Sequence, residues 1–274
     1  MEFIFPLKQN VGAPSIPLVN KGDSRQRGQL IATKPAGVLG TYLYSSVDGK
    51  VKSITDSQII IEEQNTDFSH YVPLKKKSPG ELIDEAGIVG LGGAGFPTAI
   101  KLNVDFKGKG TVIVNAAECE PILSHNVSRL EKDPEKILRG LEIVMDLVNA
   151  SHGIIAIKDI HKDAILSVKK VLRNERFSIF PLENIYPMGE ERALIRETLG
   201  VLLEPDQLPS AASAIVINAE TLFRIYEAVD LCKPLIDKDM TVAGKLKENA
   251  SVHIFTDIPI GMKVKDVLAK AGGP

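Results

Sequence analysis

The chain of 274 residues is poor in several features that would assign it to particular protein classes. It contains no tryptophan and only 5% aromatic residues, which argues against a surface that stacks nucleic-acid bases. Its net charge is −2 and no long basic run is present, so the electrostatic pattern of a nucleic-acid-binding protein is missing. Its two cysteines are too few for a disulfide framework or for an iron–sulfur cluster held by four thiolates.

Long hydrophobic runs are also missing. The longest apolar stretches, such as GIIAI (153–157), are far shorter than the roughly 20 residues that cross a membrane as a helix. The first residues, MEFIFPLKQNVG, lack the basic region and apolar core of a signal peptide. The remaining composition, with 44% hydrophobic and 25% charged residues, is typical of a globular protein. We therefore expect a cytoplasmic protein that is long enough for two domains.

The most distinctive stretch is GIVGLGGAGFP, residues 87–97, which is crowded with glycines. Glycines allow the backbone to approach a ligand closely, and Pro97 suits the first turn of a following helix. Unpaired amides ahead of a helix favour phosphate. Residues 78–88 are predicted to form a helix begun by Ser78 and Pro79, whereas a Rossmann pattern needs a strand there. One interpretation is a phosphate-binding loop between two helices; the other is a flexible loop without a ligand.

Residues 1–65 have the pattern of a small β module. The short runs FIFPL, GQLIAT, GTYLYSS, GKVKSIT and QIIIEE are separated by glycine, proline, aspartate and serine. Asp48-Gly49 predicts the turn of a β-hairpin. Residues 66–77 are predicted to form a polar linker whose final lysines mark a solvated boundary.

From residue 78 to 237 predicted helices and strands alternate, which indicates an α/β domain with a mostly parallel sheet. The predicted strands are TVIVNA, GIIAIK, FSIFPL and AIVIN, and the helices between them include one opened by Asp133-Pro134. Ligands of such sheets bind outside the carboxyl ends of the strands. TVIVN, ENIYPMGEE and AIVINAET each place polar residues directly after a strand or a strand-like run, which indicates one shared site.

Five segments carry a resemblance to a known family. They are GGAGFPT (92–98), Lys101-Leu102, NAAECEP (115–121), YPMGEE (186–191) and NAET (218–221). In order and spacing they resemble the flavin and NADH site of the family that includes the NADH-binding flavoprotein subunit of respiratory complex I and the C subunit of the Rnf complex. The branch of this family that serves proline reductase in amino-acid-fermenting clostridia has segments that resemble three sequences of this chain, AAECEPILSHN, YPMGEERA and LPSAASAIVINAETL.

The resemblance implies a fold of three parts. Residues 1–65 resemble the barrel-sandwich module of biotin and lipoyl carriers, residues 78–237 an FMN- and NADH-binding α/β domain, and residues 238–274 the start of a β-grasp (SLBB) domain. The carrier's modified lysine has no counterpart in residues 36–40, and Lys34 is out of place, so a structural or docking role is favoured over covalent cofactor carriage. Longer relatives add an iron–sulfur domain, so we expect a truncated chain with a partly unsupported tail, and iron–sulfur clusters only in a longer form.

The resemblance also implies the residues of the site. FMN contacts are expected from Gly90, Gly92, Gly93, Gly95, Lys101, Asn115, Glu118, Tyr186, Gly189, Glu190 and Asn218, and NADH contacts from Phe96, Glu120 and Glu191. No metal ligands are expected, and no catalytic side chain, because the isoalloxazine ring performs the redox chemistry. The alternatives are that Phe96 is a core residue and that Glu190 and Glu191 favour the first turn of a helix.

The chain departs from the complex I pattern at three positions. That pattern has an acidic residue at Ala117, a serine at Cys119 and an arginine at Leu91, and these changes weaken the NADH prediction more than the FMN prediction. Cys119 lies between two carboxylates, which disfavour a reactive thiolate, so we expect it to be structural. We expect His125, the one histidine near the site, to be exposed to solvent.

The function that follows is that of a flavin oxidoreductase module. NADH would reduce FMN, and electrons would pass through iron–sulfur clusters of a longer form to a protein acceptor, which the wording of the segments suggests is proline reductase. A C subunit of the Rnf type or a cobalamin reductase would use the same site with another acceptor. A docking scaffold that no longer holds flavin is the alternative from a different class.

Overall fold

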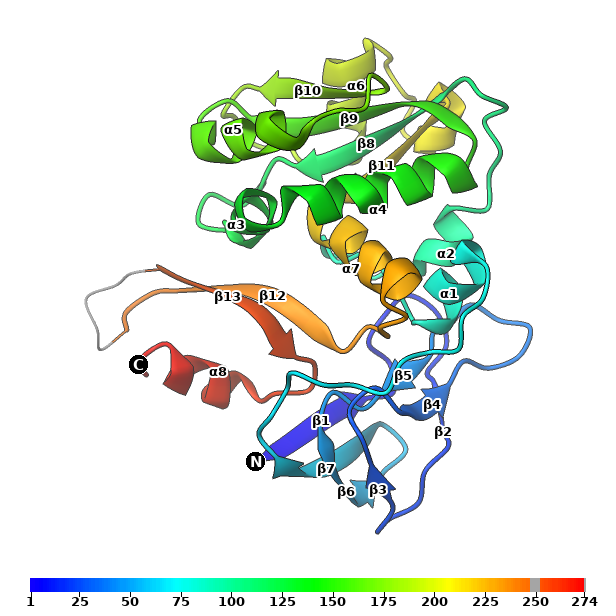
Figure 1. Cartoon of the computed structure of the whole chain (residues 1–274), viewed down its shortest axis with the longest axis vertical. Coiled ribbons are helices and arrows are strands. Elements are labelled where there is room, and N and C mark those ends of the chain that lie inside the picture. Colours follow the sequence, from blue (N-terminus) through cyan, green and yellow to red (C-terminus); the bar gives the residue numbers. More distant parts are fainter. Residues whose placement is uncertain (247–251, 274) are drawn as a thin grey trace. The chain divides into compact units, whose positions relative to one another are not determined.

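The computed structural model describes residues 1–246 and 252–273, and the chain divides into two compact units (Figure 1). The first unit combines Met1–Lys101 with Glu227–Pro274, and the second is Leu102–Tyr226. The first unit is therefore built from both ends of the chain. The domain boundaries expected from the sequence, at residues 65, 77 and 237, stay a prediction.

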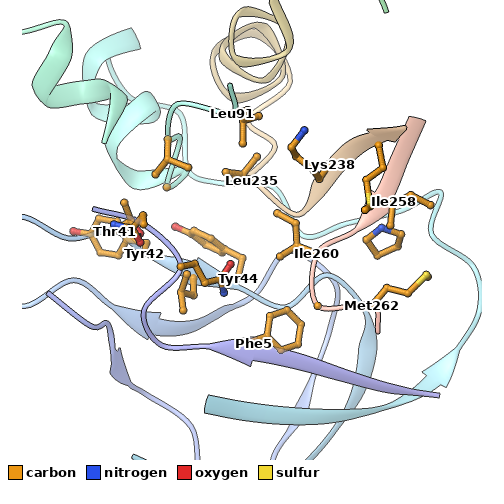
Figure 2. A pocket seen from close by; sticks show the side chains of 18 residues that line it. Phe5, Thr41, Tyr42, Tyr44, Leu91, Leu235, Lys238, Ile258, Ile260 and Met262 are labelled. Atoms are coloured by element: carbon orange, nitrogen blue, oxygen red, sulfur yellow. The ribbon is translucent and has the colours of Figure 1, made fainter. Parts of the chain in front are cut away.

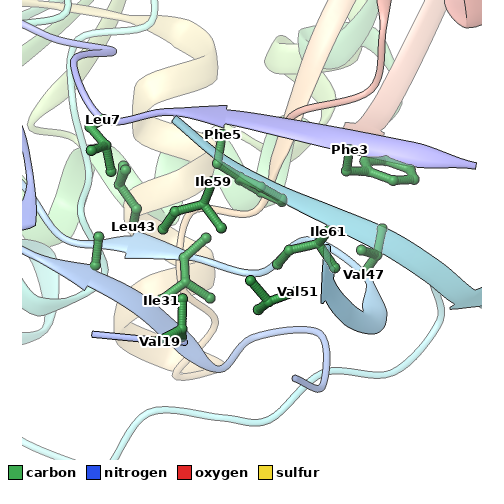
Figure 3. Packing of buried hydrophobic residues seen from close by; sticks show 11 residues of the cluster. Phe3, Phe5, Leu7, Val19, Ile31, Leu43, Val47, Val51, Ile59 and Ile61 are labelled. Carbon is green, nitrogen blue, oxygen red and sulfur yellow. The ribbon is translucent and has the colours of Figure 1, made fainter. Parts of the chain in front are cut away.

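The amino-terminal part of the first unit is a pair of antiparallel sheets around one core. The first sheet has the order β1 (Glu2–Pro6), β7 (Gln58–Asn65), β6 (Asp48–Ile54), β3 (Ser24–Arg25), and the second the order β2 (Ile16–Pro17), β4 (Leu30–Thr33), β5 (Leu43–Tyr44). Phe3, Phe5, Ile31, Ile59 and Ile61 pack together and are buried (Figure 3). Because side chains alternate along a strand, every second residue of β1 and β7 enters this core. The predicted barrel-sandwich fold is confirmed.

The predicted hairpin turn at Asp48-Gly49 is wrong, because both residues lie in strand β6. The register of β6 and β7 shifts between Asp48 and Gly49, and a Cβ atom on Gly49 would lie only 2.4 Å from the carbonyl oxygen of Glu62. This glycine therefore permits a close approach of two strands. The hairpin turn follows β6, where the Thr55 N–H donates to Gln58 O at 2.9 Å.

The rest of the first unit consists of short elements. Helices α1 (Pro79–Glu85) and α2 (Thr98–Lys101) flank the glycine-rich loop, and strands β12 (Asp237–Ala243) and β13 (Val252–Pro259) pair antiparallel before α8 (Val264–Lys270). Helix α1 begins after Ser78 as predicted, and the Glu81 carboxylate accepts from the Ser78 N–H at 3.2 Å. A buried ion pair between Arg27 Nη2 and Asp237 Oδ2, 2.6 Å apart, ties the amino-terminal sheets to β12.

The second unit contains a parallel sheet with the strand order β10-β9-β8-β11, as the alternation of helices and strands predicts. Its strands are β8 (Gly110–Ala116), β9 (Ala150–Lys158), β10 (Phe177–Leu182) and β11 (Ala214–Asn218), and its helices α3 (His125–Lys132), α4 (Pro134–Leu147), α5 (Lys162–Val171), α6 (Glu191–Leu199), the 3-10 turn Pro209–Ala212 and the start of α7 (Ala219–Asp230). The chain runs from β8 to β9 and β10 on one side and returns to β11 on the other. The topological switch point therefore lies between β8 and β11.

Helix α6 covers one face of this sheet. Leu194 and Ile195 of α6 belong to the same buried cluster as Ile113, Ala156 and Val216 of the strands. Those three strand residues share a face because Ile113 is in register with Val216, and Ala156 pairs with Asn115, two residues after Ile113. None of the helices in the described part of the chain is long and apolar enough to span a bilayer.

Candidate functional site

Three polar side chains lie on one face of the parallel sheet at the carboxyl ends of its strands. Asn115, the penultimate residue of β8, lies next to Asn218 at the end of β11, and the two asparagines are in register across the switch point. Asn115 also pairs with Ala156, and Lys158 follows two residues later on β9. Alternation along the strands therefore places Asn115, Asn218 and Lys158 on the face that α6 covers. Ligands of open α/β sheets bind at this position.

Asn115 joins the end of β8 to the loop that precedes α6. Its Nδ2 donates to Gly189 O at 2.9 Å, and its Oδ1 accepts from the Ala117 N–H at 3.2 Å. The Gly189 N–H in turn lies 3.4 Å from Cys119 Sγ. A Cβ atom on Gly189 would lie 3.0 Å from the Cβ of Cys119, so a side chain at Gly189 would require the motifs NAAECEP and YPMGEE to move apart by a few tenths of an ångström.

The carboxylate of Glu118 is bound to the first turn of α3. Its oxygens accept from the Asn126 N–H at 2.6 Å, from Asn126 Nδ2 at 3.2 Å and from the Val127 N–H at 3.3 Å. The residue is only 8% exposed. Its main-chain oxygen accepts from the ammonium of the buried Lys158 at 3.2 Å. Glu118 is thus held at both its side chain and its main chain by the protein.

Asn126, which sequence reasoning missed, connects this loop to the next strand. Its Oδ1 accepts from the Glu220 N–H at 3.2 Å, while Asn218 Oδ1 accepts from the Thr221 N–H at 3.3 Å. The first turn of α7 is therefore capped by one asparagine from β11 and one from α3. The one sequence signal for Asn126 is a polar residue shortly after Ser124, a residue type that begins helices.

The expected exposure of His125 is wrong. This residue is 9% exposed, and its Nε2 lies 3.3 Å from Asn126 Nδ2. The sequence pattern did not predict α3, and the packing of this helix buries its first residue. His161, just before α5, is also half-buried, and burial lowers its pKa although the nearby Glu118 carboxylate opposes the shift.

Glu190 is the N-cap of α6. Its carboxylate accepts from the Ala193 N–H at 2.9 Å and from Arg192 Nε at 3.2 Å. Partial burial alone would raise the pKa of Glu190, but these N–H donors outweigh it and hold the pKa below its usual value. Glu191 is the first residue of α6, and Tyr186 is exposed in the loop before the helix. Within the protein, Glu190 therefore makes the contacts of a helix cap, as the alternative interpretation of this residue expects.

The glycine-rich loop belongs to the first unit. It is closed by hydrogen bonds from the Gly90 N–H to Phe96 O at 2.9 Å and from the Gly95 N–H to Gly90 O at 3.1 Å. Gly93 has a φ of 128°, and nothing lies within 4 Å of the place where its Cβ atom would be. The segment 92–94 is exposed, so its backbone is open to a ligand. Lys101 ends helix α2, a few residues further along the chain.

The predicted cofactor residues are therefore divided between the two units. The first unit holds Gly90, Gly92, Gly93, Gly95, Phe96 and Lys101, and the second holds Asn115, Glu118, Glu120, Tyr186, Gly189, Glu190, Glu191 and Asn218. Within the second unit, the structure brings Asn115, Gly189 and Asn218 to the switch point. Glu120 is exposed in the loop after Glu118.

A separate cavity of about 310 Å³ lies within the first unit (Figure 2). The residues that line it and are labelled in the figure are mostly apolar and include Phe5, Tyr44, Leu235 and Ile260. Leu91 of the glycine-rich loop also lines it, at the position where the complex I pattern has an arginine. As the structure describes it, the cavity is lined by none of the residues predicted to bind FMN or NADH.

The donors at the carboxyl end of the parallel sheet fit the flavin mononucleotide that the resemblance implies. In residues 1–246 and 252–273, Asn218 Nδ2 has no hydrogen-bond partner, and the Lys158 ammonium has one acceptor for its three N–H groups. Amide and ammonium donors suit the hydroxyls and the phosphate of such a ligand. No group of histidine, cysteine, aspartate and glutamate side chains in the same residues could hold a metal ion.

Comparison with known proteins gives two family matches. The profile of the Nuo51 FMN-binding domain matches residues 83–227, and that of the RnfC barrel sandwich hybrid domain matches residues 1–69. The crystal structure of the NAD⁺-reducing [NiFe]-hydrogenase in its air-oxidized state shares the fold, with a TM-score of 0.58 and 24% identity over 72% of this chain and 38% of the hydrogenase chain. The predicted α/β fold behind an amino-terminal barrel-sandwich module is confirmed.

Curated relatives extend the comparison. The C subunit of the proton-translocating ferredoxin:NAD(+) oxidoreductase complex of Clostridium ljungdahlii is 33% identical over 98% of this chain and 65% of its own length. The corresponding subunit of the Na(+)-translocating complex of Acetobacterium woodii is 30% identical, with 98% and 64% covered. Cobalamin reductase PduS of Citrobacter freundii is 36% identical over 70% of this chain and 41% of its own length. The chain spans less than two thirds of the length of these relatives.

Proposed function

The chain belongs to the family of the Nuo51 FMN-binding domain, and on this premise we propose that it is an electron-transfer flavoprotein that binds FMN and accepts hydride from NADH. The observation that carries the proposal is the pair Asn115 and Asn218, which lie in register at the switch point of the parallel sheet, inside the matched region. Both asparagines come from motifs that the resemblance assigns to the flavin site.

The resemblance assigns FMN contacts to residues of both units. In the second unit, the carboxamides of Asn115 and Asn218 and the main chain around Gly189 offer donors and acceptors for hydroxyls and phosphate. In the first unit, the exposed amides of the glycine-rich loop and the positive charge of Lys101 suit an anionic or electron-rich ligand. When bound, FMN supplies the chemistry of accepting a hydride and releasing its electrons one at a time.

The proposed hydride donor is NADH, with Phe96, Glu120 and Glu191 as its contacts. Support comes from the motif positions of these residues and from the names of the two relatives that are NAD(+) oxidoreductase subunits. Glu120 is exposed and Glu191 half-exposed, so both carboxylates are accessible to ribose hydroxyls. The apolar residues at Leu91 and Ala117 reduce the number of polar contacts, so we expect weaker NADH binding than the complex I pattern would give.

The proposed acceptor is a protein, reached through iron–sulfur clusters that this chain does not hold. The delivery of electrons to proline reductase is supported only by the amino-acid sequences of the segments that contain Asn126, Tyr186 and Asn218. The relatives are subunits of ferredoxin:NAD(+) oxidoreductase complexes and a cobalamin reductase, so an acceptor of either kind fits the comparisons equally well. We place the protein in the cytoplasm, in agreement with its two unpaired cysteines.

Flavin binding tests the proposal directly. Purified protein is titrated with FMN, and the quenching of flavin fluorescence gives the dissociation constant. We expect Asn218→Ala to weaken binding by about tenfold or more, which is about 1.4 kcal/mol. Asn174→Ala is the matched control, because Asn174 Oδ1 also accepts one main-chain N–H, that of Arg176 at 3.0 Å, but lies before β10 at the opposite end of the sheet.

Anaerobic addition of NADH to the complex then tests the donor. Loss of the flavin absorbance would support NADH as the reductant and would justify substituting Glu120 and Glu191. Bound flavin that keeps its colour would reject NADH and retain FMN. A folded protein that binds no FMN would refute the flavoprotein proposal and leave the docking scaffold.

A further inference from the structure

We propose that Glu118 and Asn126 form a buried clamp that sets the shape of the loop 117–120, and that Glu118 serves the flavin site as a positioning residue without contacting the flavin. This inference rests on the proposed function and deepens it. The family resemblance places Glu118 among the cofactor contacts, whereas the structure shows its carboxylate bound to protein amides.

The first step of the argument concerns the hydrogen bonds of the Glu118 carboxylate. Oε1 accepts the main-chain N–H groups of Asn126 and Val127 at 2.6 and 3.3 Å, and Oε2 accepts Asn126 Nδ2 at 3.2 Å. These amides open helix α3, where the helix dipole also favours a negative charge. A carboxylate that turned towards a ligand would give up these bonds and leave the amides unpaired. Its stable place is therefore at the helix.

The second step concerns Asn126, which bonds to both sides of the switch point. It donates to Glu118 in the loop after β8, and its Oδ1 accepts from the Glu220 N–H at the start of α7, directly after β11. Asn218 caps the neighbouring Thr221 N–H. The two strand ends that carry Asn115 and Asn218 are thereby joined through one buried side chain. A change at Asn126 is transmitted to both.

The third step concerns the backbone of Glu118. Its φ is 43°, in the left-handed region that residues with a side chain rarely adopt. Such a conformation persists only where the surroundings hold it, and it is concentrated at functional sites. Here the holding contacts are the bonds of the carboxylate to α3 and the bond from Lys158 Nζ to the Glu118 main-chain oxygen. Release of the carboxylate would let the loop relax and move Cys119, the next residue, away from Gly189.

The reactivity of Cys119 reports the shape of this loop without any flavin. Alkylation of the intact protein by iodoacetamide is followed at each cysteine by peptide mass spectrometry. In Glu118→Ala and Asn126→Ala we expect Cys119 to react about fivefold or more faster, because local opening exposes the thiol, while Cys232 in the first unit keeps its rate. In Asn174→Ala both rates stay at the wild-type value. An unchanged Cys119 rate, or an equal rise at both cysteines, would overturn the clamp.

A double-mutant cycle on FMN affinity separates positioning from direct contact. If both residues act through one clamp, each alanine variant weakens FMN binding by about tenfold, and the double variant is no weaker than either alone. If Glu118 contacts FMN directly, Glu118→Ala lowers affinity further in the Asn126→Ala background, which overturns the proposal. Glu118→Gln keeps an oxygen for the Asn126 and Val127 amides and should retain most of the affinity and the slow Cys119 reaction. Its failure to do so counts against the clamp.

The two proposals fail in distinguishable ways. If the wild-type protein binds no FMN but Cys119 responds as expected, the flavin function is refuted and the clamp stands. If the protein binds FMN and neither Cys119 nor the double-mutant cycle responds as expected, the clamp is refuted and the flavin function stands.

Discussion

Replacing Asn115 by aspartate exchanges the side-chain NH₂ group of this central site residue for an oxygen. The Nδ2 that donates to Gly189 O at 2.9 Å becomes a carboxylate oxygen facing a carbonyl oxygen, while the oxygen that accepts from the Ala117 N–H is kept. The ionised form of the introduced carboxyl group is therefore disfavoured in the folded protein. Its pKa there rises above the unfolded value of about 3.9.

The size and sign of the effect follow from these contacts. Loss of the hydrogen bond costs about 1 kcal/mol. The repulsion between the two oxygens adds about 1 kcal/mol, a low value because Asn115 is only half-buried. Because the folded pKa is raised, the destabilisation by this repulsion is absent below the unfolded pKa. It grows as the pH rises through the folded pKa and is constant above that pKa. In its protonated form the new carboxyl group can also donate to Gly189 O, which restores the lost hydrogen bond at low pH.

Urea unfolding of the flavin-free protein at pH 4.5 and pH 7.5 measures this. We expect the free energy of unfolding of Asn115→Asp to lie about 2 kcal/mol below that of the wild type at pH 7.5, and to recover roughly 1 kcal/mol of this deficit at pH 4.5. Asn115→Ala loses both contacts but should show the same deficit at the two pH values. Equal deficits for the aspartate variant at both pH values would refute the geometry at Gly189.

Two further predictions concern the helices that flank the site. Alanine in place of a helical glycine usually stabilises a protein by up to about 1 kcal/mol, but Gly140→Ala should destabilise it by about 3 kcal/mol in urea unfolding, because the new Cβ atom would lie 2.1 Å from Leu222 O of α7. Gly140→Ala at wild-type stability would contradict this packing. Glu190→Ala should cost no more than about 1 kcal/mol through loss of the α6 cap. Because its folded pKa is lowered, the contribution of Glu190 is present above the unfolded pKa and lost as the pH falls through the folded pKa; a thermal-unfolding difference that persists in acid would argue against the cap.

The sequence predicted the parallel sheet because its local patterns agree with its tertiary role. The runs TVIVNA, GIIAIK and AIVIN are short, apolar and rich in β-branched residues, and the helices between them are amphipathic. Helix α3 was missed because HNVSRLEK is mostly polar, with Val127 and Leu130 as its apolar residues. Its first turn is fixed by Glu118, a contact across eight residues that no periodicity reveals. The role of Asn126 depends on that helix, so it was missed too.

Other features depend on contacts between distant residues. Arg27 and Asp237 are 210 positions apart, and their buried ion pair helps to join both ends of the chain in the first unit. Gly49 follows an aspartate, so by local pattern it resembles a turn residue. Its actual neighbour is the main chain of Glu62 on the next strand. In both cases the residue that determines the local structure is too distant in the sequence to contribute to a local pattern.

The departure at Ala117 bears on the choice of hydride donor. Ala117 is fully buried, and it packs in the apolar cluster with Met188 and Leu194 beneath α6. An acidic side chain at this position would lie in apolar surroundings, where an unpaired charge is costly. The alanine at position 117 therefore suits its apolar surroundings, which would not accommodate an acidic side chain. The carboxylate of Glu118 is bound to α3 and that of Glu190 caps α6, whereas Glu120 is exposed to solvent. If NADH is the hydride donor, its binding should depend on Glu120 and Glu191, which occupy the NADH positions of the two motifs, more strongly than FMN binding does.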